Sequence, residues 1–149
     1  MEPPRYQAAN DHLMQIAEAD GLQMSRPEIR ANSHLAMMAD AFARDAGMQE
    51  PFHTNMLNAY WQEHRNIGLR EVVLDVAAKS GLDAADLEKA FDEGRYEQEL
   101  ADIYDECHRY GITGVPTFLI GRYMVVGAQP YEILEKALAL ASQEDEPAR

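Results

Sequence analysis

Two short apolar runs near the carboxyl end of the chain predict a tight β-hairpin. They cover Thr117–Ile120 and Tyr123–Val126, and only the dipeptide Gly121-Arg122 separates them. A two-residue connection that begins with glycine is typical of a type II′ turn, because glycine readily adopts the positive φ that this turn requires. Pro116 stands directly before the first run, where the missing N–H of a proline is tolerated at the start of a strand. Pro130 follows the second run and suits the first turn of a final helix.

The residues before the hairpin are divided by glycine and proline into six segments with helical patterning. Within each segment, apolar residues recur at three- and four-residue spacing, which is the pattern of an amphipathic helix. Asn32, Ser33 and Asp83 carry side chains that are favoured at helix N-termini. The sequence therefore predicts a mostly helical α/β chain, with helices over about 6–19, 34–46, 51–61, 69–80, 84–93 and 95–109.

The dipeptide Val115-Pro116, the hairpin and the following Gly127-Ala128-Gln129-Pro130 together resemble the carboxyl-terminal end of DsbA-like thioredoxin-fold proteins. The resemblance is strongest to the FrnE-like oxidoreductases and extends from about Pro4 to about Leu140. It implies a partial DsbA-like thioredoxin fold, in which a helical insertion is followed by a β-hairpin and a terminal helix. On this basis we expect a helical insertion domain over 1–113, the thioredoxin-fold ββα part over 114–141 and a flexible tail over 142–149.

The resemblance also defines what this sequence lacks. Members of the family carry a Cys-x-x-Cys pair on the first βα turn, whereas this sequence has one cysteine, Cys107. Nothing before Tyr6 could supply the first strand, the active-site helix and the second strand of the family. The resemblance therefore implies a thiol-disulfide oxidoreductase that is inactive or incomplete as this chain, and no catalytic residue is assigned.

Binding residues are implied by the same resemblance. The corresponding Val-Pro bond is cis in the family, so the resemblance implies a cis bond between Val115 and Pro116. Val115, Pro116 and Thr117 are expected to present backbone groups to an extended peptide or a protein thiol substrate. Asn32, Tyr60 and Trp61 resemble positions that line the cleft between the helical insertion and the thioredoxin core. A helix cap and two packing aromatic residues explain these three equally well.

The single cysteine is expected to be structural. Cys107 shares the apolar stripe of its helix with Ile103 and Tyr104, where a cysteine is usually a small buried hydrophobic residue. It also lies far from the helix N-terminus, which would lower the pKa of a thiol. The five histidines show no i, i+4 pair, so no metal site is expected.

Composition excludes several classes of function. The formal net charge is −13, and no stripe of lysine and arginine is present to neutralise phosphates, so nucleic acid is not an expected partner. No apolar run approaches the ~20 residues of a membrane-spanning helix, and no signal sequence precedes the first helix, so no membrane partner is expected. One cysteine agrees with a reducing compartment, and the expected location is cytoplasmic.

An isolated hairpin leaves unpaired backbone groups along two edges. Three outcomes stay open: the chain is part of a longer protein, it forms a homodimer through the exposed edge, or a helix covers the edge. Two other functions also stay open. One is a non-catalytic peptide-binding or protein-binding module that works by β-addition. The other is a relative of glutathione-using isomerases and transferases; apart from such glutathione, no cofactor is expected.

Overall fold

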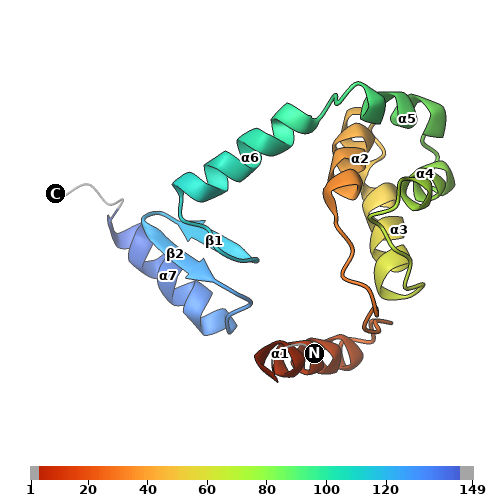
Figure 1. The fold of residues 1–149 in the computed structure, drawn as a ribbon. Helices are drawn as coiled ribbons and strands as arrows, with labels where there is room; N and C mark the ends of the chain where they lie inside the picture. The colour runs from red at the N-terminus through yellow and green to blue at the C-terminus, as the bar shows by residue number, and fades with distance from the viewer. Residues whose placement is uncertain (1–3, 145–149) are drawn as a thin grey trace. The chain divides into compact units, whose positions relative to one another are not determined.

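The computed structural model describes residues 4–144, which form seven helices and a two-stranded sheet (Figure 1). The chain forms two compact units that divide between Leu100 and Ala101. The predicted division into 1–113, 114–141 and 142–149 concerns parts of the family fold and stays a prediction. Of the predicted tail, residues 142–144 continue the last helix, and the rest lies outside the described residues.

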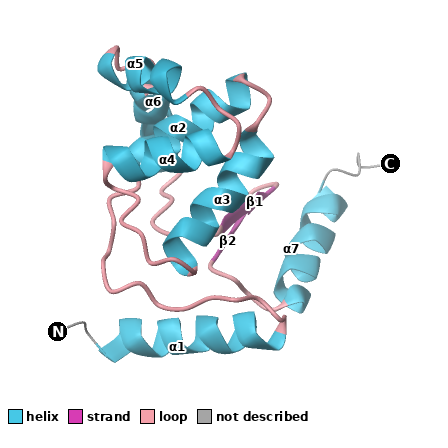
Figure 2. Ribbon diagram, turned by 90° about the vertical axis from the view of Figure 1, so that its right-hand side faces the viewer, coloured by secondary structure: helices cyan, strands magenta, loops and turns pink. Residues whose placement is uncertain are grey.

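The first unit is helical. Its elements are α1 (Pro4–Ala19), α2 (His34–Asp45), α3 (Gln49–Trp61), α4 (Arg70–Lys79), α5 (Ala84–Asp92) and the beginning of α6 (Glu97–Arg109). Figure 2 shows α2, α3, α4 and α5 grouped together, and their apolar faces enclose the main core. The largest side chains that this core buries fully are those of Met38, Phe52, Val73, Val76 and Leu87. All of them lie on predicted helices, which confirms the amphipathic patterning as the source of this core.

Capping side chains set the start of two of these helices. Asp83 Oδ1 accepts hydrogen bonds from the backbone N–H groups of Ala85 and Asp86, as expected for an N-cap aspartate. At α2, Asn32 Oδ1 accepts the backbone N–H of His34 at 2.9 Å. The Ser33 side chain makes no capping hydrogen bond, so Asn32 supplies the cap at this helix.

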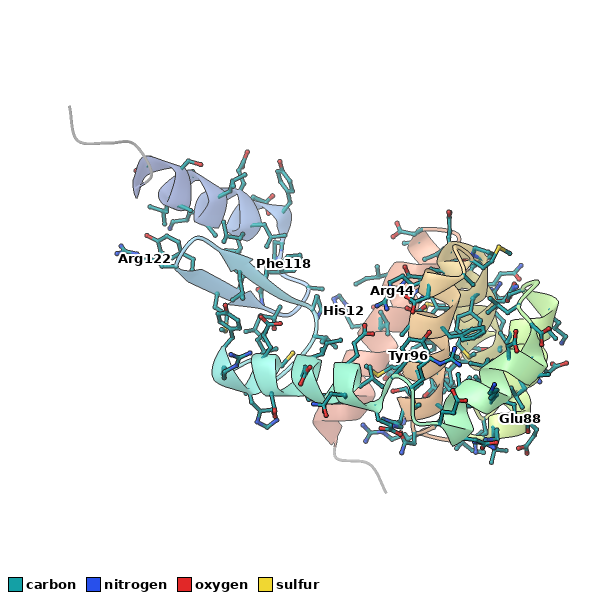
Figure 3. All side chains as sticks on the ribbon, turned by 90° about the horizontal axis from the view of Figure 1, so that it is seen from above. His12, Arg44, Glu88, Tyr96, Phe118 and Arg122 are labelled. Atoms are coloured by element: carbon teal, nitrogen blue, oxygen red, sulfur yellow. The ribbon has the colours of Figure 1, made fainter. Side chains whose placement is uncertain are left out.

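The beginning of α6 is attached to α2 by polar contacts. The Tyr96 hydroxyl donates to Asp45 Oδ2 at 2.9 Å, and Arg44 donates from both terminal nitrogens to the Glu99 carboxylate. A third contact joins His34 Nε2 to Glu97 Oε2 at 2.9 Å. Figure 3 labels Arg44 and Tyr96, which belong to this cluster. These contacts attach the first turn of α6 to both ends of α2.

The second half of α6 corrects one expectation. Tyr96 and Leu100 are buried, but farther along the same stripe Ile103 and Tyr104 are 42% and 46% exposed. Cys107 is half-buried and has a free thiol, where the sequence predicted a small buried hydrophobic residue. Helical periodicity correctly grouped these residues on one side, but it does not establish that another element covers that side along its whole length.

The second unit contains the predicted hairpin. Strands β1 (Thr117–Ile120) and β2 (Tyr123–Val126) have the predicted bounds, and α7 (Tyr131–Glu144) follows. The strands are antiparallel, with Ile120 opposite Tyr123. Gly121 has a φ of 58°, which confirms the reason for a glycine at the first turn position. The strand and helix bounds confirm the mostly helical chain with a terminal ββα segment.

Helix α7 covers one face of the hairpin (Figure 2). Ala137 and Ala141 are its buried residues, and their small side chains allow a close approach. A Cβ atom at Gly121 would lie 3.1 Å from the Ala141 Cβ, so the turn packs directly against this helix. No helix among the described residues is long and apolar enough to cross a membrane.

Candidate functional site

The candidate site is the backbone around Val115, directly before β1. Val115 is 91% exposed, and its peptide bond to Pro116 is cis. No described residue forms a backbone hydrogen bond with Val115. The backbone N–H and C=O of this residue are therefore available to another molecule.

Hydrogen bonds hold the residues on both sides of Val115. The Gly127 N–H donates to the Pro116 carbonyl at 2.7 Å, and the Thr117 hydroxyl donates to the Gly114 carbonyl at 2.6 Å. The two carbonyls that flank Val115 are thus already paired within the unit. The exposed backbone of Val115 is consequently held between two fixed points, which reduces the conformational entropy lost on binding a partner.

The register determines which backbone groups face outward. In an antiparallel pair, residues that exchange hydrogen bonds alternate with residues whose N–H and C=O point away from the partner strand. The bond from Gly127 to Pro116 and the two-residue turn place Ile120 and Phe118 in the hydrogen-bonded positions. Thr117 and Leu119 therefore direct their backbone groups to the outer edge of β1, in line with the predicted unpaired edge.

The outer edge of β2 is different, because one of its groups is already paired. On this strand Met124 and Val126 direct their backbone groups outward by the same alternation. The side-chain Nε2 of Gln129 donates to the Val126 carbonyl at 2.9 Å. No such contact from the described residues reaches the outward carbonyls of β1, so the two edges of the hairpin are not equivalent.

One face of the hairpin is also apolar and exposed. Leu119, Met124 and Val126 share this face and are 48%, 41% and 43% exposed. On the opposite face, Ile120, Tyr123 and Val125 are half-buried, in agreement with cover by α7. Phe118 belongs to that second face and is labelled in Figure 3. The sequence predicted strands that need burial on both sides, and within this unit only one side receives it.

The predicted cleft residues belong to the helical unit. Asn32 caps α2, and the Tyr60 hydroxyl donates to the Ile29 carbonyl at 3.4 Å. The Tyr60 and Trp61 rings meet edge to face, with centroids 5.0 Å apart. These contacts match a cap and two packing aromatic residues. A role for the three residues in a substrate cleft stays a prediction.

Near Trp61 the structure shows a contact that sequence patterns did not indicate. Ser25 Oγ lies 2.7 Å from His64 Nε2, and the Ser25 N–H donates to the Trp61 carbonyl at 3.0 Å. His64 has a φ of 54°, which is unusual for a residue other than glycine. The pair attaches the segment after α1 to the end of α3. Neither residue lies in a periodic segment, so no sequence signal was available to pair them.

Charge interactions shift several pKa values in the helical unit. Hydrogen bonds from Arg44 lower the pKa of Asp45 and of Glu99, and Tyr96 contributes to the shift at Asp45. The two carboxylates in turn raise the pKa of Arg44. Burial, followed by the bond to Asp45, raises the pKa of Tyr96. Arg44 pairs with both carboxylates and Tyr96 pairs with Asp45, so contacts within the folded helical unit account for these pKa shifts.

Metal binding finds no support in the described part of the chain. No three histidine, cysteine, aspartate or glutamate side chains of residues 4–144 lie close enough to hold an ion. The groups exposed around Val115 are backbone hydrogen-bonding groups, beside the apolar face that Leu119, Met124 and Val126 form.

Comparison with known proteins relates the whole chain to one family and one fold. The family model for the DSBA-like thioredoxin domain matches residues 1–139. The uncharacterized protein YwbO of Bacillus subtilis strain 168 is 28% identical over 144 residues, which cover 93% of this chain and 70% of YwbO. The crystal structure of a probable DsbA oxidoreductase from Streptomyces coelicolor is 27% identical and superposes with a TM-score of 0.79. That match covers 100% of this chain but 65% of the Streptomyces chain, so this chain spans less than two thirds of that relative.

Proposed function

Because this chain belongs to the DsbA-like thioredoxin domain family, we propose that it carries the polypeptide-binding part of a thiol-disulfide oxidoreductase. Val115, Pro116 and Thr117 are the proposed binding residues. The observation that carries the proposal is the exposed, unpaired backbone of Val115 between two carbonyls that are already hydrogen-bonded. An extended peptide or protein thiol substrate can pair with such a backbone without dependence on its side chains.

Disulfide exchange by this family uses a pair of thiols, and these 149 residues contain a single cysteine. A thiolate attacks a disulfide sulfur and forms a mixed disulfide, which a second thiol must then resolve. Cys107 is the only cysteine, lies near the carboxyl end of α6 and is half-buried. We therefore expect binding of substrate without catalytic turnover by this chain.

The experiment that tests this proposal has two parts. The first is turnover in insulin reduction and dithiol oxidation by the 149-residue chain, beside Cys107→Ser; both proteins should be inactive. Activity that disappears in Cys107→Ser would contradict the proposal and indicate a one-cysteine mechanism that uses glutathione. The second is binding of carboxymethylated insulin B chain, an unfolded polypeptide without free thiols, which should bind both proteins equally.

A second function is favoured by the open edge of β1. Thr117 and Leu119 direct backbone groups outward, and a strand from another protein or from a second copy of this chain fits there by β-addition. Under this hypothesis the chain is a non-catalytic binding module or a homodimer.

Two finer proposals concern the family branch and the location. The Gly-Ala-Gln-Pro ending supports membership of the FrnE-like branch, and the single cysteine supports a cytoplasmic location.

A further inference from the structure

Gln129 pairs with the end of β2 through both its side chain and its backbone. Its Nε2 donates to the Val126 carbonyl at 2.9 Å. Its backbone N–H donates to the Gly127 carbonyl, also at 2.9 Å. Gln129 thus satisfies two consecutive carbonyl groups, that of the last residue of β2 and that of the residue after it.

Both carbonyls lack a strand partner within the hairpin. Gly127 and Pro116 stand in a hydrogen-bonded position of the ladder, because the Gly127 N–H donates to Pro116. Proline has no N–H to return the bond, so the Gly127 carbonyl has no cross-strand donor. The Val126 carbonyl points away from β1 because it belongs to the alternate position. Gln129 supplies a donor to each of them.

These bonds connect Gln129 to the candidate site. Gly127 has a φ of +87°, a conformation that few residues besides glycine adopt, and Gln129 closes the turn that this residue opens. The Gly127 N–H in turn holds the Pro116 carbonyl next to Val115. We propose that Gln129 is a positioning residue, which fixes the polypeptide-binding backbone at Val115 through Gly127 and Pro116. This inference rests on the proposed function.

The test compares Gln129→Ala and Gln129→Glu with the wild-type chain. Gln129→Glu keeps the size of the side chain but replaces the donor by an acceptor facing the Val126 carbonyl. Gln143→Ala is the matched control, because Gln143 is an exposed glutamine of α7. The dissociation constant for carboxymethylated insulin B chain should rise about tenfold in both Gln129 variants and stay unchanged in the control.

A second measurement does not depend on the peptide. Hydrogen exchange of the Gly127 amide, followed by NMR, should become about tenfold faster in both Gln129 variants, because the bond to Pro116 opens more often. Faster exchange with unchanged peptide affinity would overturn the positioning role and leave Gln129 a purely structural residue. Unchanged exchange would overturn the inference outright.

The two measurements also separate the inference from the proposed function. If the wild-type chain does not bind the peptide, the proposed function fails, and the role of Gln129 in peptide binding fails with it. Gly127 exchange would then still show whether Gln129 holds the Pro116 carbonyl. If the wild type binds and neither Gln129 variant differs from it, the proposed function stands and the inference alone is wrong.

Discussion

The Tyr96 hydroxyl donates a hydrogen bond to Asp45 Oδ2 over 2.9 Å and thereby joins the start of α6 to the end of α2. The Tyr96 side chain is 5% exposed, so its hydroxyl exchanges water for a charged acceptor on folding. Arg44 donates to the other oxygen of the same carboxylate. The first turn of α6 is therefore held against the end of α2 within the helical unit.

Tyr96→Phe should lower the free energy of unfolding of the helical unit by about 1.5–3 kcal/mol, because a hydrogen bond to a charged acceptor is lost. Urea denaturation followed by circular dichroism measures this change. Tyr131→Phe is the control, because Tyr131 is 73% exposed and should change the stability little. Equal stability of the two variants would mean that the Tyr96 bond does not form in solution.

Acid should destabilise the helical unit through the carboxylates that pair with Arg44. Hydrogen bonds from Arg44 hold the pKa values of Asp45 and Glu99 below their ordinary values in the folded chain. A carboxyl group with a lowered folded pKa stabilises the fold above its unfolded pKa, and this contribution disappears as the pH falls through the folded pKa. Stability should therefore decrease below about pH 4.5.

Glu99→Gln tests this assignment, because the variant should show a weaker dependence of stability on pH between about 2 and 5 than the wild type. Denaturant unfolding at a series of pH values measures it. Glu88→Gln is the control: Glu88 is exposed on α5, is labelled in Figure 3, and forms no ion pair with another described residue. An identical pH profile in wild type and Glu99→Gln would contradict the pairing with Arg44.

Alanine substitutions at two residues of α3 should differ in how much stability they remove, because only one of the two side chains lies in the core. Phe52 is fully buried, whereas Leu57 is 46% exposed. Phe52→Ala should cost about 3–5 kcal/mol of stability, because it removes buried apolar area and leaves a cavity. Leu57→Ala should cost less than about 1 kcal/mol. Thermal or urea unfolding of the two variants measures these changes. A similar loss of stability in both would mean that α3 presents a different face to the core.

Self-association should depend on the outer edge of β1. Leu119→Pro removes an N–H that points away from β2, so the hairpin should form while addition of a strand is blocked. Sedimentation velocity at increasing concentration should show less dimer for Leu119→Pro than for the wild type. Met124→Pro makes the corresponding change on the outer edge of β2 and should leave the dimer in place. A dimer that resists Leu119→Pro would place the interface elsewhere.

The hairpin and the helices could be predicted from the sequence because their signals are local. The turn dipeptide Gly121-Arg122 sets the strand bounds, and the predicted strands coincide with β1 and β2. The N-cap of α5 could also be predicted, since the Asp83 side chain accepts hydrogen bonds from the first turn of this helix. Helix bounds shifted by a few residues, because frayed first turns carry little sequence information.

Exposure and long-range pairing could not be predicted in the same way. The stripe that contains Ile103, Tyr104 and Cys107 is apolar, but its cover depends on elements distant in sequence. The bonds of Gln129 follow from the position of Pro116 opposite Gly127, which is a property of the strand register. Gln129 belongs to the Gly-Ala-Gln-Pro motif, but no local pattern indicated that it would bond to the Val126 and Gly127 carbonyls.

An NMR titration of the isotopically labelled 149-residue chain with carboxymethylated insulin B chain tests whether the Val115 segment binds polypeptide. The largest changes in backbone amide shifts should occur at Val115, Thr117 and the adjacent Gly114, while the amides of α5 stay unchanged. Saturation at these amides would establish the Val115 segment as a polypeptide-binding site. An unchanged spectrum, or changes confined to the helical unit, would mean that polypeptide does not bind at the Val115 segment.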